Sequence, residues 1–290
     1  SSFPVDDPLV IEGLEFAAAE QWGVLLDNVE NVVVRDNWFH DCVSGLMPIE
    51  VVGDSRGITI ERNLFEDNNG GILAPCKDVT VGYNVLERTS YVWGQWSPAI
   101  YLAGGSGTEN VLVEGNVVRN TGPTYEYDRR DVTEFITAIG PIAVGGINCV
   151  IRGNLVVEAL AGIAGHGDLP TIGEYARDIV IERNVIRNSF PWVEPGISLD
   201  LVSGGRMANN YVNMAWREAM RSSSSHDIVI EDNVLLGHIL LLDTDRTTVR
   251  HNTVVFDPNA ATEGPPYVAP ANTFGIVGGD SYVDSIQSQG

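Results

Sequence analysis

The sequence VVVRDNWF, residues 32–39, contains the pattern that decides the fold. Two apolar residues spaced by two positions, Val32 and Val34, precede an asparagine, Asn37, and another apolar residue follows two positions later. The pattern returns at residues 58–65, 79–86, 111–118, 149–156, 179–186, 228–235 and 247–254. A degenerate copy surrounds Asn210, and a first copy at residues 9–16 has Leu14 where the asparagine should stand.

The distance between successive asparagines varies from 19 to 38 residues, while the pattern itself stays constant. Its apolar residues alternate by two, which is typical of β-strands, whereas a helix would require a period of 3.6. A further strand signal precedes the copies, as in GILA at residues 71–74 and GISL at 196–199. A constant core with connections of variable length indicates a coil of short strands, with three strands in each turn.

An asparagine at a sharp bend can bond to the backbone there and to the asparagines stacked above and below it. With nine such asparagines, the sequence resembles the right-handed parallel β-helix family, pectin-lyase-like proteins with PbH1-type repeats, from Leu9 to about Val255. The resemblance implies an all-β fold: a single right-handed parallel β-helix (a solenoid) of about ten turns over residues 1–256, with an internal asparagine ladder. We expect residues 257–290 to form an irregular C-terminal strand or cap.

The composition excludes several partners. The chain of 290 residues has 39 acidic and 17 basic residues and a net charge of −22, with Lys77 as its single lysine. This charge repels nucleic-acid phosphates and anionic lipids, and no apolar run approaches the ~20 residues that span a bilayer. We therefore expect neither nucleic acid nor a membrane as partner. Because the strands begin at Leu9, we expect a short cap, a further domain or another subunit to cover the N-terminal end of the stack.

Outward positions of one strand form columns along the stack, with ~4.8 Å between turns. On the strand that follows the long loop, the fifth position reads Asp27, Ile49, Pro75, Ala103, Gly145, His166, Asp200, Ser223 and Leu242. Ionisable residues gather on three consecutive turns, which carry His166, Asp200 and Arg221. A hydrogen bond between His166 and Asp200 would fix the imidazole tautomer for a general base. The alternative interpretation is a surface strand whose polar residues bond to one another for stability.

The resemblance also implies carbohydrate chemistry. The stretch GHG at residues 165–167 matches one element of the polygalacturonase-like hydrolases, but their Asn-Thr-Asp and paired-Asp elements are missing. In a polysaccharide lyase, His166 or Tyr101 would be the base and Arg221 would stabilise the enolate charge. In a glycoside hydrolase, Asp200 would pair with a second carboxylate. The candidates for that second carboxylate are Asp168 and Glu194.

The longest connections lie between Asn84 and Asn184, and they are rich in aromatic and arginine side chains. Aromatic faces stack on sugar rings, and arginines bind hydroxyls or carboxylates. We therefore expect the substrate to contact Tyr101, Trp93, Trp96, Trp192, Arg129, Arg130, Trp216 and His226. The alternative is that the loop aromatics pack onto the stack as small local cores.

The sequence identifies no cofactor and no established metal-binding spacing. Ca²⁺ is the one metal for which an acidic loop offers ligands, although such a loop is expected in a protein of this charge. The acidic residues of this loop are Glu126, Asp128, Asp131 and Glu134.

These observations predict an extracellular or periplasmic protein that acts on a polysaccharide or oligosaccharide, as a lyase or a glycoside hydrolase. The alternative is a non-catalytic glycan-binding or structural module, such as a segment of an adhesin or tailspike, or a fragment of a larger protein.

Overall fold

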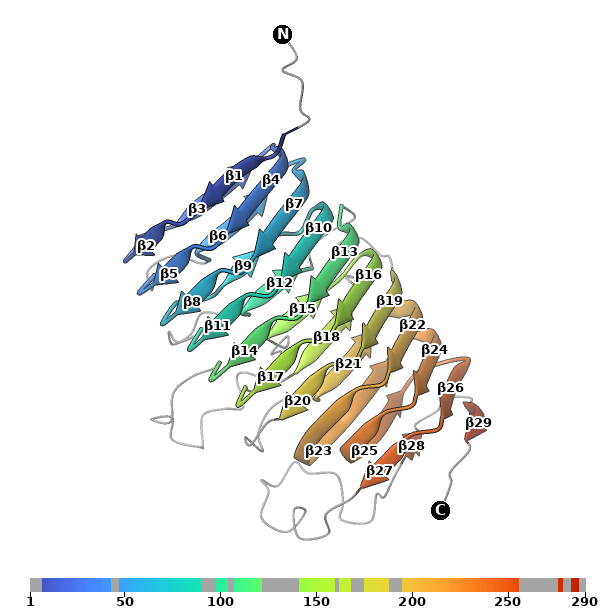
Figure 1. The fold of residues 1–290 in the computed structure, drawn as a ribbon. Helices are drawn as coiled ribbons and strands as arrows, with labels where there is room; N and C mark the ends of the chain where they lie inside the picture. The colour runs from blue at the N-terminus through green and yellow to red at the C-terminus, as the bar shows by residue number, and fades with distance from the viewer. Residues whose placement is uncertain are drawn as a thin grey trace.

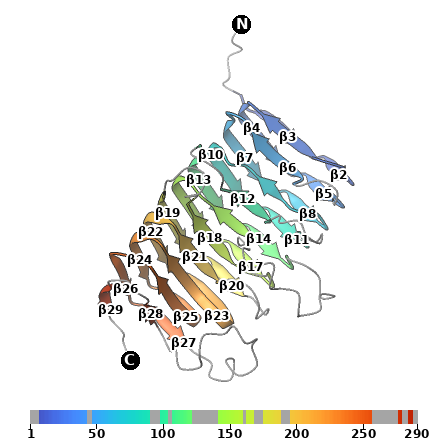
Figure 2. The same ribbon diagram turned by 180° about the vertical axis from the view of Figure 1, so that it is seen from behind.

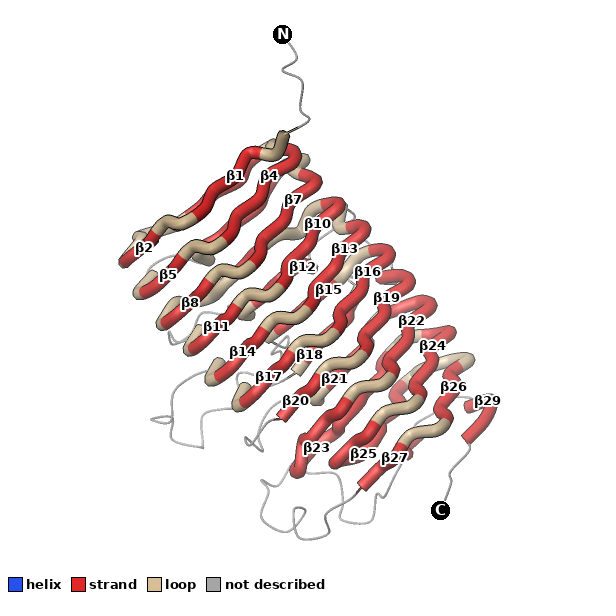
Figure 3. Tube along the Cα trace, in the orientation of Figure 1, coloured by secondary structure: helices blue, strands red, loops and turns tan. Residues whose placement is uncertain are grey.

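The chain coils around one axis, and each strand pairs in parallel with the strands one turn before and one turn after it (Figure 1). The computed structural model describes residues 7–42, 47–89, 98–103, 107–121, 141–159, 162–167, 175–187, 195–255, 276–278 and 283–286. Within these ranges the chain has strands and connecting loops but no helix (Figure 3). The described part of the protein therefore also lacks a helix of the length and apolarity needed to cross a membrane.

Three stacks of strands make up the coil, and Figure 2 shows them from behind. The first stack precedes the asparagines: β1 (Leu9–Glu12), β4 (Glu30–Arg35), β7 (Arg56–Glu61), β10 (Lys77–Gly82), β13 (Glu109–Glu114), β16 (Ile147–Arg152), β19 (Ala176–Glu182), β22 (Val202–Ala208), β24 (His226–Glu231), β26 (Thr247–Arg250) and β29 (Val283–Ile286).

The second stack follows the asparagines: β2 (Glu15–Ala17), β5 (Trp38–His40), β8 (Leu64–Glu66), β11 (Val85–Glu87), β14 (Val117–Arg119), β17 (Leu155–Val157), β20 (Val185–Arg187), the first parts of β23 (Tyr211–Ser223) and β25 (Val234–Leu242), and β27 (Thr253–Val255). The third stack contains β3 (Val24–Asp27), β6 (Ile49–Val52), β9 (Ile72–Leu73), β12 (Ile100–Leu102), β15 (Ile142–Val144), β18 (Ile163–His166), β21 (Ile197–Asp200), the last parts of β23 and β25, and β28 (Ile276–Gly278). The all-β parallel coil expected from the repeat is therefore confirmed.

The inward side chains of the three stacks form one continuous apolar core along the axis. Apolar residues alternate with outward polar ones, as in β7, where Ile58 and Ile60 are fully buried. Identical residues stack in successive turns: the ring centroids of Phe16 and Phe39 are 4.7 Å apart, and those of Phe39 and Phe65 are 4.9 Å apart. Each turn thus buries the apolar side chains of the next turn, whereas a single turn could not bury its own.

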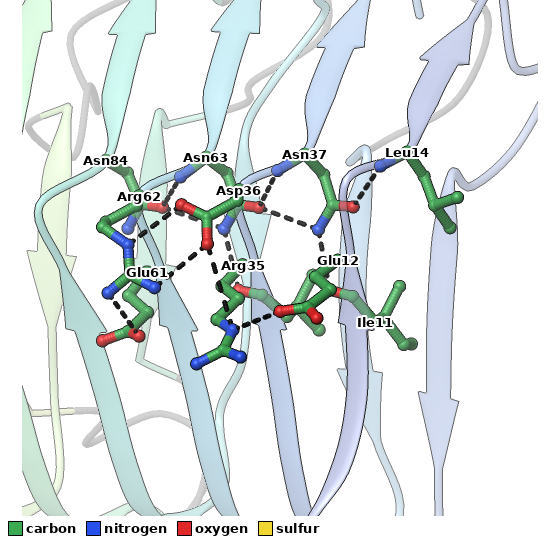
Figure 4. A network of polar contacts seen from close by, with 11 residues as sticks. Ile11, Glu12, Leu14, Arg35, Asp36, Asn37, Glu61, Arg62, Asn63 and Asn84 are labelled. Carbon is green, nitrogen blue, oxygen red and sulfur yellow. Dashed lines mark hydrogen bonds and ion pairs between the residues drawn. The ribbon is translucent and has the colours of Figure 1, made fainter.

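The asparagines form a ladder inside the coil, and Figure 4 shows its beginning. Asn84 is representative: its Nδ2 donates to Ile60 O at 2.9 Å and to Oδ1 of Asn116 at 3.0 Å. Its Oδ1 accepts the backbone N–H of Asn63 at 2.9 Å and the Nδ2 of Asn63 at 3.0 Å. The same arrangement connects Asn37, Asn63, Asn84, Asn116, Asn154, Asn184, Asn210, Asn233 and Asn252. At the first turn the N–H of Leu14 donates to Oδ1 of Asn37, so the ladder ends there.

The residue before each ladder position has a positive φ, between 53° and 69°. This left-handed conformation turns the chain sharply and is unfavourable for most residues other than glycine, asparagine and aspartate. The sequence nevertheless has Arg62, Tyr83 and Arg183 at such bends. The ladder bonds on the following asparagine therefore hold the backbone in a conformation that local preference alone does not select.

Oppositely charged side chains alternate along the outer edge of the first stack. The register aligns Glu12 with Arg35 and Glu61, and further along Glu114 with Arg152 and Glu182. Arg35 contacts Glu12 at 2.6 Å, and Arg152 contacts Glu114 at 2.7 Å (Figure 4 shows the first pair). Each of these arginines thus meets a carboxylate in a neighbouring turn, and such pairs of opposite charge favour the observed register.

We predict that Asn84→Ala destabilises the protein by about 3 kcal/mol or more, because Ile60 O and the Asn63 N–H are left buried without a partner. Urea unfolding followed by circular dichroism measures the change. Asn213→Ala, which removes an amide from the outer surface of β23, is the control and should cost less than about 1 kcal/mol. Equal losses in the free energy of unfolding for the two variants would contradict a stabilising role of the asparagine ladder.

We also predict a pH-dependent attachment of the first turn. His40 contacts Asp41 at 2.8 Å and, across the turn, Glu15 of β2 at 3.0 Å, and these carboxylates raise the pKa of His40. The stabilisation is fully present below the ordinary histidine pKa of about 6.5 and is lost as pH rises through the folded-state pKa. The expected result is a loss of wild-type stability as the pH rises above about 6.5, and His40→Gln should reduce this loss. An NMR titration that finds no elevated pKa for His40 would disprove it.

Candidate functional site

The third stack brings the predicted ionisable residues together on its outer face. The register sets His166 opposite Asp200 and Asp200 opposite Ser223, and it sets Ser198 opposite Arg221. The neighbouring positions of this column are thus in the predicted order. Its second turn was assigned wrongly: Ile49 is buried and lies opposite Val24, whereas Val52 lies opposite Asp27. The count had started three positions too early, because Pro48 takes the place opposite Gly23.

The two ring nitrogens of His166 differ in their hydrogen bonding within the described structure. Its Nδ1 lies 3.3 Å from the carbonyl oxygen of Gly167. Because a carbonyl can only accept, Nδ1 carries the proton in this contact, and Nε2 of the neutral ring keeps its lone pair. Nε2 is buried, and no described residue forms a hydrogen bond with it. A polar atom in this state costs about 1–3 kcal/mol, so it is a position where a ligand hydroxyl or proton would be stabilised.

Asp200 pairs with Arg221. The Arg221 Nη2 donates to the Asp200 Oδ2 at 3.1 Å, and both side chains are 26% exposed. The predicted hydrogen bond between His166 and Asp200 is therefore not formed: the charged guanidinium takes the carboxylate, and Nδ1 of His166 turns to the backbone. The pair leaves a half-buried carboxylate neutralised at the edge of the site.

Tyr101 lies on the other side of His166. The centroids of the two rings are 6.4 Å apart, with an angle of 39° between their planes. Ala143 and Ala164 occupy the positions next to Tyr101 in the following two turns, so only small side chains separate the tyrosine from the histidine turn. Both alanines are buried although they face outward from the stack. Tyr101 and His166 therefore border a floor of small residues.

His226 lies on a different stack of strands from these residues. It begins β24 in the first stack, where its Nδ1 contacts Asp227 Oδ2 at 2.9 Å and its ring meets the edge of Tyr175 at 5.1 Å between centroids. The pKa of Asp227 is lowered, first by its hydrogen bonds to Arg246 and then by the bond to His226. These contacts make His226 part of a separate surface cluster.

Several predicted residues lie outside the described part of the chain. They are Asp168, Glu194, Trp93, Trp96, Trp192, Arg129 and Arg130, and the candidate Ca²⁺ ligands Glu126, Asp128, Asp131 and Glu134. Trp216 belongs to β23, but its side chain is also outside the described residues. Among the residues that are described, no group of three His, Cys, Asp or Glu side chains is arranged to hold a metal ion.

Glu218 is a residue that the column count missed. It lies on β23 opposite His238, and its buried Oε2 has no hydrogen-bond partner in the part of the chain that the structure describes. The pairing of β23 with β25 shifts register on both sides of Glu218, so counting from a leading small residue does not align it with the other turns. No sequence signal marks such a bulge, because the extra residue obeys neither the period of two nor the repeat.

Comparison with known proteins supports the fold. Residues 5–136 match the family model described as the right handed beta helix region. The resemblance inferred from the repeat is therefore confirmed at the level of the fold: the chain forms a right-handed parallel β-helix. A comparison with curated protein sequences gives no significant match.

Similar solved structures include two enzyme modules and a tailspike. The A-module of the mannuronan C-5 epimerase AlgE4 of Azotobacter vinelandii has a TM-score of 0.49 and 13% identity, over 95% of this chain and 81% of that one. The Dettilon tailspike protein has a TM-score of 0.48 and 12% identity, over 96% of this chain and 62% of that one. The A-module of the AlgE6 epimerase of A. vinelandii has a TM-score of 0.41 and 10% identity, over 96% and 81%.

We predict that Gly145→Ala disturbs the site through His166. A Cβ at Gly145 would lie 2.5 Å from the His166 carbonyl oxygen, so the backbone of β18 would have to move. The expected loss of stability is about 1–3 kcal/mol, measured by urea unfolding. Gly107→Ala is the matched control, because a Cβ there meets nothing within 4 Å. If the two substitutions have equal effects, Gly145 does not fix the position of His166.

Proposed function

We propose that the protein binds a polysaccharide across the outer face of β12, β15, β18, β21 and β23 and acts on it by acid–base chemistry, with His166 as the base. The observation that carries this proposal is the buried, unbonded Nε2 of His166 beside the Asp200–Arg221 ion pair. Unsatisfied polar atoms are rare in folded proteins and gather at functional sites. The resemblance of the repeat to carbohydrate-active β-helices supplies the substrate class.

Proton abstraction makes use of this arrangement. In a polysaccharide lyase, Nε2 of His166 would take the proton alpha to a uronate carboxylate, while Nδ1 keeps its proton against Gly167 O. Arg221 would stabilise the negative charge that develops on the substrate, and Asp200 would hold the guanidinium in place. Tyr101, across the floor of small residues, would donate a proton to the leaving oxygen or stack on the sugar ring.

Hydrolysis is the second reaction type, and it needs two carboxylates about 5–9.5 Å apart. Asp200 would be one of them, with Asp168 or Glu194 as the other. The Asp200 carboxylate already accepts a hydrogen bond from the Arg221 guanidinium. The unbonded His166 nitrogen has no role in this scheme, so we favour the lyase.

We also propose that the β-helix comprises residues 1–256, that residues 257–290 complete its C-terminal end, and that the protein works outside the cytoplasm. Two strands beyond residue 257 support the second point, because β28 continues the third stack and β29 the first.

A substrate screen tests the activity. We expect incubation with uronate polysaccharides, with and without Ca²⁺, to produce unsaturated ends that absorb in the ultraviolet. His166→Gln and Asp200→Asn should each lower the rate by about 10²-fold or more, the usual size of an acid–base contribution. His251→Gln and Asp243→Asn, which change the same residue types elsewhere on the surface, are the controls and should leave the rate unchanged.

Three outcomes would change the assignment. New reducing ends without unsaturation would identify the hydrolase instead. Binding without turnover would favour the non-catalytic glycan-binding module. Full activity in a folded double variant of His166 and Asp200 would place the site on another face of the coil.

A further inference from the structure

The arginines of one turn differ from the others in their charge partners. Within the described residues, every other arginine contacts an aspartate or glutamate within 4 Å. Arg177, Arg183 and Arg187 do not, and all three lie between the start of β19 and the end of β20. In a chain with a net charge of −22, acidic partners are abundant, so their absence around one turn is a specific feature of this surface.

Two of these arginines share one surface. Arg187 and Val185 both face outward from β20, and Arg183 lies at the bend just before that strand; both arginines are exposed. We call the face formed by Arg183, Val185 and Arg187 the β20 arginine surface. The residues opposite them in the adjacent turns carry no charge: Gly153, Leu155 and Val157 on one side, and Asn209, Tyr211 and Asn213 on the other. Glu158, the residue after Val157, donates its backbone N–H to the carbonyl oxygen of Arg187.

The neighbours of the arginines are suited to a sugar. The guanidinium carbon of Arg187 lies 5.6 Å from the centroid of the Tyr211 ring, which leaves its N–H groups available to an anion. Leu155, Val185 and Tyr211 form a half-buried apolar strip across three turns, and Asn209 and Asn213 add amides at its margins. Apolar and aromatic groups contact ring faces, amides bond to hydroxyls, and arginine binds carboxylate in a bidentate manner.

We propose that the β20 arginine surface is a binding site for the carboxylate groups of an anionic polysaccharide, separate from the His166 site. Arg183 at the bend and Arg187 at the end of β20 are four positions apart in the sequence, at most about 13 Å of backbone, so a polymer with repeated carboxylates would contact both. The choice of a polysaccharide rests on the proposed function, whereas the anionic character follows from the unpaired arginines. A nucleic acid is disfavoured because the acidic remainder of the protein would repel its dense phosphates.

The chain supplies matched controls. Arg62 occupies the same bend as Arg183 with the same positive φ, but contacts Asp36 and Glu61. Arg119 occupies the same strand position as Arg187, two turns earlier, but contacts Glu87. The double variants Arg183→Gln with Arg187→Gln and Arg62→Gln with Arg119→Gln therefore remove the same charge from equivalent backbone positions.

Isothermal titration calorimetry with the full chain tests the proposal, with polygalacturonate and alginate as carboxylated probes. We expect Arg183→Gln with Arg187→Gln to weaken binding by about tenfold or more, and the Arg62 and Arg119 pair to change it by less than about twofold. The wild-type affinity should fall as salt is added. Neutral dextran should not bind.

Other outcomes would overturn the proposal. Equal weakening by both double variants would mean that only net charge matters. Binding of dextran sulfate or single-stranded DNA through the same arginines, without binding of the carboxylated probes, would assign a different anion. An absence of binding by the folded wild type would also overturn it. The variants Asp200→Asn and His166→Gln separate the two sites, because they should retain binding while losing turnover. If the wild type binds the carboxylated probes but does not turn them over, the proposed activity is wrong and the proposed binding at the β20 arginine surface still stands.

Discussion

Asparagine side chains stacked inside the coil hold its successive turns together. Each amide bonds to a backbone carbonyl of the preceding turn and to the next asparagine, so it satisfies polar groups that the bend would otherwise bury unpaired. Its bonds run along the coil axis, and each turn therefore fixes the height and register of its neighbour. The left-handed residue before it, such as Tyr83 or Arg183, is tolerated because the following asparagine is held from both sides.

This constraint acts at one corner of each turn and leaves the other connections free. The distances between ladder asparagines range from 19 to 38 residues without interrupting the stack. Long segments can thus be inserted after the second stack, and the outward residues of the third stack can change from turn to turn. The scaffold and the candidate site are consequently under different constraints. Inward residues must pack in the core, whereas outward residues are free to vary with what the surface binds.

Charge pairing divides the surface into neutralised and unpaired regions. Most described arginines neutralise carboxylates in adjacent turns, as Arg152 does with Glu114, and Arg221 does the same for Asp200 within the candidate site. Arg183 and Arg187 depart from this rule, and His166 departs from the rule that buried polar atoms are bonded. Such departures from local consistency are where function is expected, since the fold itself gains nothing from them.

The coil could be predicted from the sequence alone, because the period of two, the recurring asparagine and the variable spacing together indicate a stack of short parallel strands. The repeat also predicted that His166 and Asp200 follow each other in one outward column and that Arg221 lies on the next turn, since parallel register follows from the repeat. The pairing of their side chains could not be read from the repeat: Asp200 bonds to Arg221 instead of His166, because the choice depends on side-chain rotamers that the repeat does not specify. Ile49 and Glu218 were misplaced or missed for a similar reason, since a shifted strand start or a bulge leaves the apolar pattern almost unchanged. The unpaired arginines likewise became visible only in three dimensions, because the ion pairs between turns join residues such as Arg246 and Asp227 or Arg152 and Glu114, which are 19 and 38 positions apart in the sequence.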